Sequence, residues 1–147
     1  MTTRKRNAAL TICCGGVALV LLIAALHFFL PGGRTYTLNL PDYGDLRGVT
    51  LTQRDGQAVQ LADAYGEDVL FVLKGGGRAT QNESIQDAPV NVDDYIRVDF
   101  DHKAGGTSTL FVYHKSDARN GEYFIEQPYN GVYPISRREY DLLARYV

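Results

Sequence analysis

Cysteine is nearly absent from this sequence of 147 residues, and its two copies, Cys13 and Cys14, both lie in an apolar N-terminal run. Residues 31–147 contain none, so that part of the chain has no disulfide, no thiolate metal site and no thiol nucleophile. Tryptophan is missing altogether, whereas Val, Ile, Leu, Phe and Tyr are abundant after residue 34. We therefore expect a domain that is stabilised by its apolar core alone.

Histidine is also scarce, with only His102 and His114 beyond the apolar run. They lie near opposite ends of a predicted hairpin, about 20 Å apart at roughly 3.3 Å per residue, too far to share a metal. We interpret them as surface residues. No serine has the context of a nucleophile elbow, and Gly75-Gly76-Gly77-Arg78 lacks the Lys-Ser/Thr ending of a phosphate loop. The sequence thus predicts no metal, no cofactor and no enzymatic activity.

Positive charge is in short supply outside the N-terminus. All seventeen acidic residues follow Pro31, where twelve basic residues oppose them, a difference of −5. Such a surface repels phosphate backbones, which excludes nucleic acid as an expected partner. Four carboxylates, Asp93, Asp94, Asp99 and Asp101, could bind calcium or act as a glycosidase pair, but no EF-hand spacing exists. A solvated strand face is our interpretation.

Residues 8–30 form an almost continuous apolar run, longer than the roughly 20 residues that a membrane-spanning helix needs. The cluster Arg4-Lys5-Arg6 places the N-terminus in the cytoplasm. A cleavable signal peptide has a shorter apolar region and a small-residue cleavage site, and a lipoprotein needs a small residue where Ile12 stands. We expect a cytoplasmic tail (1–7), a transmembrane helix (8–30), a linker (31–34) and an extracytoplasmic domain (35–147).

The apolar pattern of residues 35–147 predicts an α+β fold, an antiparallel meander with one or two helices packed on a face. Alternation predicts strands at 35–40, 49–52, 95–101, 107–114, 122–127 and 132–135, and a short one near 79–83. Asn120-Gly121 predicts a hairpin turn, and Ser136 with Glu139 has the spacing of a helix capping box. Residues 63–74 fit either a helix, which we favour, or a buried strand. We expect the domain to be monomeric.

Tyrosine is enriched in the last third of the chain, and tyrosines suit binding surfaces. Pro128 and Asn130-Gly131 predict a turn, with positive φ expected at Asn130-Gly131. A turn does not require a tyrosine at position 129. We therefore predict a polar-aromatic binding surface, whose candidate residues are Tyr113, Gln127, Tyr129 and Tyr133. The alternative is that Tyr129 packs on the C-terminal helix near Tyr140 or Leu143.

Four stretches resemble a family of uncharacterised extracytoplasmic domains from Gram-positive bacteria. They are residues 83–93, 95–100, 106–113 (Gly-Thr-Ser-Thr-Leu-Phe-Val-Tyr) and 126–133 (Glu-Gln-Pro-Tyr-Asn-Gly-Val-Tyr). Such domains occur behind a lone membrane or lipid anchor, or on membrane peptidases that resemble the β-lactam sensors. The resemblance covers roughly residues 65–147 and implies export and no assigned catalysis. The chain lacks a lipobox and a His-Glu-x-x-His sequence, so the peptidase activity does not transfer.

Two functions follow as expectations. The first is a membrane-anchored, non-catalytic binding or sensory domain for a protein or cell-envelope ligand. The second is a cell-envelope hydrolase, or an inhibitor of one, that uses surface carboxylates.

Overall fold

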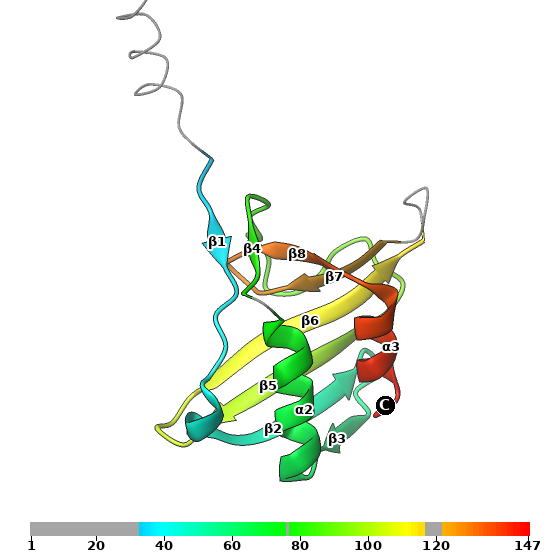
Figure 1. Cartoon of the computed structure of the whole chain (residues 1–147). Helices are drawn as coiled ribbons and strands as arrows, with labels where there is room; N and C mark the ends of the chain where they lie inside the picture. The colour runs from blue at the N-terminus through cyan, green and yellow to red at the C-terminus, as the bar shows by residue number, and fades with distance from the viewer. Residues whose placement is uncertain (1–32, 76, 117–121) are drawn as a thin grey trace, which may run out of the picture. The chain divides into compact units, whose positions relative to one another are not determined.

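The structure is a computed structural model that describes residues 33–75, 77–116 and 122–147. In it, segments of alternating apolar residues form a six-stranded antiparallel sheet (Figure 1). Its strands are β2 (Leu46–Gln53), β3 (Ala58–Gln60), β5 (Tyr95–His102), β6 (Thr107–Lys115), β7 (Glu122–Glu126) and β8 (Val132–Ile135), in the order β3-β2-β5-β6-β7-β8. The predicted α+β class and the meander β5–β8 are confirmed, and β3 had not been expected.

The predicted transmembrane helix and the Asn120-Gly121 turn lie outside the described residues. Within the described ranges, no helix has the length and hydropathy needed to span a membrane.

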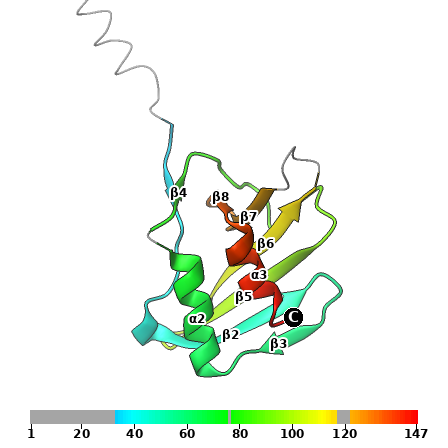
Figure 2. The same cartoon turned by 45° about the vertical axis from the view of Figure 1, so that its right-hand side comes forward.

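Two helices cover one face of the sheet (Figures 1 and 2). They are α2 (Asp63–Lys74) and α3 (Arg137–Ala144). Residues 63–74 are therefore helix, as favoured, because Val69, Leu70 and Leu73 point into the core while Phe71 is 70% exposed. The helix ends at Gly75, whose φ of 51° a glycine adopts without strain.

The core lies between these helices and the sheet. It contains buried side chains from the strands, among them Val49, Leu51, Val98, Phe100, Leu110 and Ile125, together with Leu143 of α3. Gly66 of α2 allows close packing, since a Cβ there would lie 3.1 Å from Val49. Residues Thr35–Val147 form one compact unit on this core.

The predicted capping box opens α3. Ser136 Oγ accepts a hydrogen bond from the backbone N–H of Glu139, and Glu139 Oε2 accepts one from Ser136 N at 2.7 Å. The other oxygen of Glu139 pairs with Arg78, which also donates to the carbonyls of Leu73 (2.8 Å) and Val72 (3.2 Å) at the end of α2. The cap of one helix is thereby joined to the C-terminus of the other.

The strand expected at 35–40 is shorter than predicted. Only β1 (Tyr36–Thr37) pairs, with β4 (Ala79–Thr80), in a separate two-stranded sheet. Beyond it, Leu38 N donates to Arg78 O, and Asn39 bonds to the side chain of Gln127 instead of to a strand. The segment then continues into a short 3₁₀ helix, η1 (Tyr43–Asp45).

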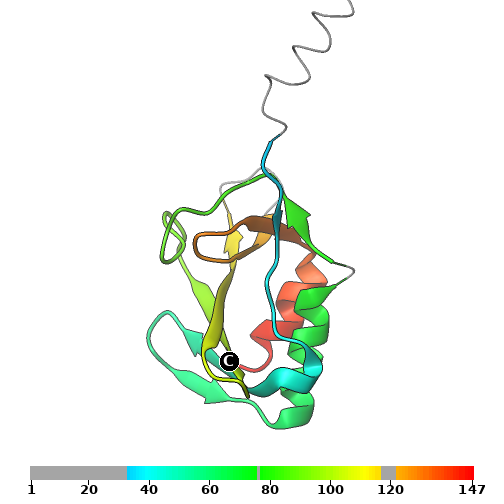
Figure 3. The same ribbon diagram turned by 90° about the vertical axis from the view of Figure 1, so that its left-hand side faces the viewer.

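The connector of residues 81–94 runs past the face of the sheet that the helices leave open (Figure 3). Glu83 forms a bridge to Gly131, and Ser84 is buried against this face. Phe111 and Tyr113 of β6 are buried here, although they point away from the helices. Both faces of this part of β6 are therefore covered.

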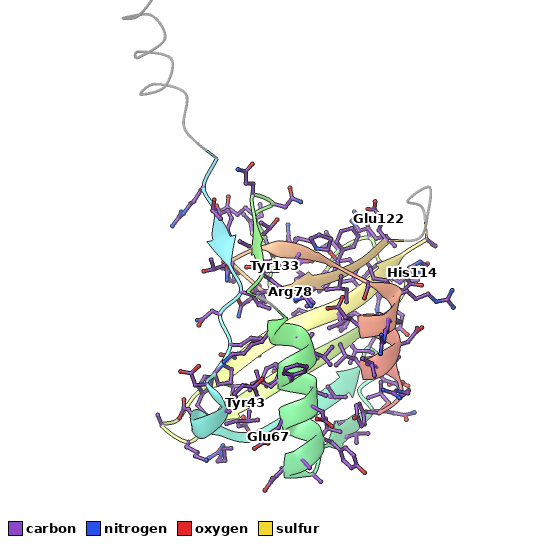
Figure 4. The ribbon with its side chains drawn as sticks, viewed as in Figure 1. Tyr43, Glu67, Arg78, His114, Glu122 and Tyr133 are labelled. Carbon is purple, nitrogen blue, oxygen red and sulfur yellow. The ribbon has the colours of Figure 1, made fainter. Side chains whose placement is uncertain are left out.

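Both histidines are partly exposed and lie near opposite ends of the β5–β6 hairpin, as expected. His102 forms hydrogen bonds with Asp45 Oδ2 (2.9 Å) and Ser108 Oγ (2.8 Å), and the pKa of Asp45 is held below its usual value, chiefly by the bond from His102. His114 lies at the far end of β6, where its ring centroid is 4.6 Å from that of Tyr123 (Figure 4).

Candidate functional site

The β7–β8 connection is a tight turn that places Tyr129 at its tip. Gln127 N donates to Gly131 O at 3.0 Å, and Asn130 N donates to Gln127 O at 3.1 Å. Pro128 occupies the second position of the turn and Tyr129 the third, where its φ of 56° is the positive value that a type II turn has at this position. The expectation of positive φ at Asn130-Gly131 is wrong, because the third position of the turn, which takes the positive φ, is occupied by Tyr129.

The ring of Tyr129 faces solvent. The residue is 67% exposed, and its hydroxyl donates a hydrogen bond of 2.6 Å to Asp87 Oδ1 in the 81–94 connector. This bond to a carboxylate raises the pKa of Tyr129 above its usual value. The alternative placement, in which Tyr129 packs on the C-terminal helix, is therefore wrong. The strained backbone fixes the residue at its Cα, and the bond to Asp87 restrains the hydroxyl at the tip of the side chain.

Gln127 serves the fold instead of the surface. Its side chain is buried, and its amide accepts from Asn39 N at 2.9 Å and donates to Asn39 O at 2.7 Å. Asn130 Nδ2 donates to Gln127 Oε1 (2.6 Å) and to Thr37 O (2.8 Å). The side chains of Gln127 and Asn130 thus bind the backbone of residues 37–39, much as the backbone of a neighbouring strand would.

The register of the sheet separates the two remaining candidates, Tyr113 and Tyr133. Tyr133 pairs with Ile125 on the helix side and is 1% exposed. Tyr113 pairs with Tyr95 on the opposite face and is 3% exposed. Burial raises the pKa of both phenols. The structure does not bring the four candidates to one surface, and only Tyr129 presents its ring to solvent.

A depression of about 490 Å³ lies beside Tyr129. It is lined by Asn39, Thr107, Ser108, Thr109, Gln127, Pro128, Tyr129 and Asn130, and we call it the Tyr129 depression. None of these eight residues is charged, although the domain carries many carboxylates. Sequence reasoning named two of them as site residues and missed the row Thr107–Thr109, which reads as an ordinary strand start. All eight lie within residues 34–134, the segment that matches the DUF5301 family.

The chain belongs to the DUF5301 family. The family is described as a domain of unknown function (DUF5300), and the expected kinship with uncharacterised domains is confirmed at that level. The Gram-positive distribution of the resembled family stays a prediction. The DUF5301 fold also resembles the NMR structure of a protein from Ruminococcus gnavus, with a TM-score of 0.56 and 24% identity over 72% of this chain and 98% of that one. No curated protein matched the chain.

Within the described part of this DUF5301 domain, one carboxylate is buried. Glu126 of β7 is buried, at 6% exposure, and Ser84 Oγ donates to its Oε1 at 2.7 Å. Tyr113 lies against the same carboxylate: burial, then the charge of Glu126 and a hydrogen bond to it, raise the pKa of Tyr113 far above 10. Because these groups bind one another away from solvent, their effect is to fasten the 81–94 connector to the sheet.

The strand carboxylates considered for calcium or hydrolysis are also engaged. Asp99 accepts a hydrogen bond from Thr109 Oγ1 at 2.6 Å and pairs with Arg97 at 2.9 Å. Asp101 accepts from Thr107 Oγ1 at 2.9 Å. These contacts hold β5 and β6 together on the open face of the DUF5301 sheet.

Proposed function

We propose that this chain is a membrane-anchored, extracytoplasmic and non-catalytic binding module, and that its ligand contacts Tyr129 in the Tyr129 depression. The observation that carries the proposal is the exposed ring of Tyr129 on a backbone with φ 56°. A left-handed conformation costs a residue other than glycine roughly 1–2 kcal/mol, so stability alone favours glycine at this position. Strain at an exposed aromatic residue points to a function for the side chain.

The geometry suits recognition. A tyrosine offers a large amphipathic surface with few rotatable bonds, and the hydrogen bond to Asp87 restrains it further before a ligand arrives. Around it the depression offers hydroxyl, amide and backbone groups without charge. Such a lining favours a ligand that is read by hydrogen bonds and by contact with an aromatic ring.

The location is inferred from the sequence. The apolar run 8–30 and the cluster Arg4-Lys5-Arg6 support a cytoplasmic N-terminus and a domain on the outside. The Tyr129 depression would then meet a protein or a ligand of the cell envelope. A hydrolase or an inhibitor of one is the alternative, and it requires a working carboxylate.

The test compares three versions of the full-length chain as baits in a cell-envelope extract of the source cells. They are the wild type, Tyr129→Ala and, as a control, Phe71→Ala, which removes an aromatic ring of similar exposure from α2. A partner that uses this site is captured by the wild type and by the control. Its affinity for Tyr129→Ala falls about 30-fold or more, the effect of losing roughly 2 kcal/mol at a central aromatic contact.

Thermal melting of the variants accompanies the titration. Tyr129→Ala removes an exposed ring, so its Tm stays within a few degrees of the parent. Partners that bind Tyr129→Ala as tightly as the wild type would refute the proposed site. The hydrolase would be favoured if the wild type cleaves an envelope polymer and this activity is lost when Asp99 or Asp101 is replaced by Asn.

A further inference from the structure

Strand β6 extends past the end of its neighbour β7. On one side β6 pairs with β5 along its length, from Asp101↔Thr107 to Tyr95↔Tyr113. On the other side its pairing with β7 begins only at Phe111↔Glu126. Residues 107–110 are therefore paired on one side alone.

The hydrogen-bond phase of the hairpin shows which groups face the unpaired side. His102 N donates to Gly106 O at 3.1 Å, which makes this a hydrogen-bonded pair. Such pairs alternate along an antiparallel ladder, so Ser108 and Leu110 direct their N–H and C=O groups toward β5. Thr107 and Thr109 direct theirs away from it.

A second turn gives the same phase. Gln127 N donates to Gly131 O, so Gln127 directs its backbone groups toward β8, and by alternation Ile125 does the same. The backbone groups of Glu126, between them, face the other way and pair with Phe111 of β6. The next partner in this register, opposite Thr109, would be Pro128. Proline has no N–H to donate, and the chain turns away at this residue. Within the described residues, no backbone group pairs with the outward N–H and C=O of Thr107 and Thr109.

This free edge is a wall of the Tyr129 depression, which Asn39 and the β7–β8 turn also line. We propose that the partner is a polypeptide that binds there in an extended conformation, as an added strand on β6 with one side chain against Tyr129. The inference rests on the proposed function and names the class of its ligand. An extended peptide repeats its backbone groups every two residues, about 6.6 Å, which is the repeat of the outward groups of Thr107 and Thr109.

The surroundings favour recognition through the peptide backbone. Exposed strand edges are commonly protected by lysine, proline or a bulge, and Thr107-Ser108-Thr109 has none of these. The lining residues themselves are uncharged, and the hydroxyls of Thr107, Thr109 and Tyr129 donate to the carboxylates of Asp101, Asp99 and Asp87. Specificity would then come from the contact with Tyr129, and affinity from the added hydrogen bonds.

The test uses the full-length chain and a displayed library of random decapeptides. The peptide that binds most tightly is synthesised, and amide exchange of the protein is followed residue by residue. Without peptide, the amides of Thr107 and Thr109 exchange faster than those of Ser108 and Leu110. With saturating peptide, exchange at Thr109 slows at least about tenfold while Ser108 changes little.

Two kinds of variant sharpen the result. Thr109→Pro removes the outward N–H but keeps the bonds to β5, and it weakens peptide binding about tenfold. Thr109→Val, the matched variant, loses the same hydroxyl bond to Asp99 but keeps this N–H, so the difference in affinity between the two variants measures the N–H alone. Methylation of the peptide nitrogens one at a time abolishes binding at alternate positions only, and this measurement needs no protein variant.

The outcomes separate this proposal from the previous one. If peptide binding depends on Tyr129 but neither slows amide exchange at Thr109 nor shows the alternating effect of peptide methylation, the proposed site stands and strand addition is overturned. Binding that depends on the Thr109 edge and ignores Tyr129→Ala would overturn the role of Tyr129 alone. Protection of Thr109 that grows with protein concentration and without peptide would assign the edge to a second copy of the chain, which overturns the proposal. So would a library without a binder.

Discussion

Glu139 links the two helices, and its replacement by Gln is the sharpest test of how the domain is held together. One carboxylate oxygen accepts from Ser136 N and Oγ, both at 2.7 Å, and the other pairs with Arg78. The Arg78 guanidinium also caps the last carbonyls of α2. Glu139→Gln keeps the size of the side chain and an oxygen for the cap but removes the charge that faces Arg78.

The expected cost follows from the exposure of the pair. The side chains of Arg78 and Glu139 are 15% and 27% exposed, so solvent screens their attraction only in part. A hydrogen bond between charged groups contributes about 1.5–3 kcal/mol, and partial exposure places this one toward the lower end. We expect Glu139→Gln to lower the free energy of unfolding by about 2 kcal/mol at neutral pH. For a domain of this size the Tm falls by roughly 8–12 °C.

The cost should depend on pH in one direction. Burial would raise the pKa of Glu139, but the hydrogen bonds from Ser136 and the charge of Arg78 outweigh it and hold the pKa below 4.5. A carboxyl with a lowered folded pKa contributes stability that is fully present above its unfolded pKa and is lost as the pH falls through the folded value. The difference between wild type and Glu139→Gln should therefore shrink as the pH falls below 4.5.

Urea unfolding of wild type and variant, at about pH 7 and about pH 3, measures both effects. Glu67→Gln, which neutralises an exposed carboxylate of α2, is the control and should change stability by less than about 0.5 kcal/mol. A double-mutant cycle with Arg78→Met should show coupling above about 1 kcal/mol. An equal cost at both pH values, or no coupling, would refute the ion pair as the cause.

Three further predictions test the turn, the strain and the topology. Gly131→Ala places a Cβ 2.7 Å from Thr80 Cγ2 and 2.9 Å from the hydroxyl of buried Tyr133. Thermal melting should therefore show that the free energy of unfolding falls by about 1–3 kcal/mol. The control is Gly44→Ala, whose new Cβ has no atom within 4 Å, and it should match the wild type. Tyr129→Gly relieves positive φ and loses one exposed hydrogen bond, so its Tm should equal or exceed that of the parent, and a fall of more than about 4 °C would contradict the strain. Protease added to intact protoplasts should digest residues 34–147, and survival of the domain until the membrane is broken would reverse the orientation.

Much of the fold followed from local sequence patterns. Strands β5 to β8 were predicted because alternation with period two is readable within one strand, and the capping box because Ser136 and Glu139 are three residues apart. Residues 63–74 were harder, since a short apolar run suits both a helix and a strand. Packing against the sheet decided for the helix, in which Phe71 can face solvent.

The candidate site was predicted only in part. Tyr129 stood out because a turn explains the proline and the glycine but leaves the tyrosine without a structural reason. Tyr113 and Tyr133 could not be assigned to a surface, because the register of the sheet decides which face each occupies. The burial of Gln127 could not be foreseen for a similar reason, since its partner Asn39 lies 88 residues away.

The sequence by itself determined strands β5 to β8, the start of helix α3, the α+β class and the exposed turn at Pro128, because these depend on side chains within a few residues of one another. Only the tertiary structure decided the geometry of the Tyr129 depression. The free edge of Thr107–Thr109 exists because β7 turns away at Pro128 while β6 continues, and the wall at Asn39 exists because Gln127 holds that segment in place. Such features arise from contacts between distant segments, which no local pattern records.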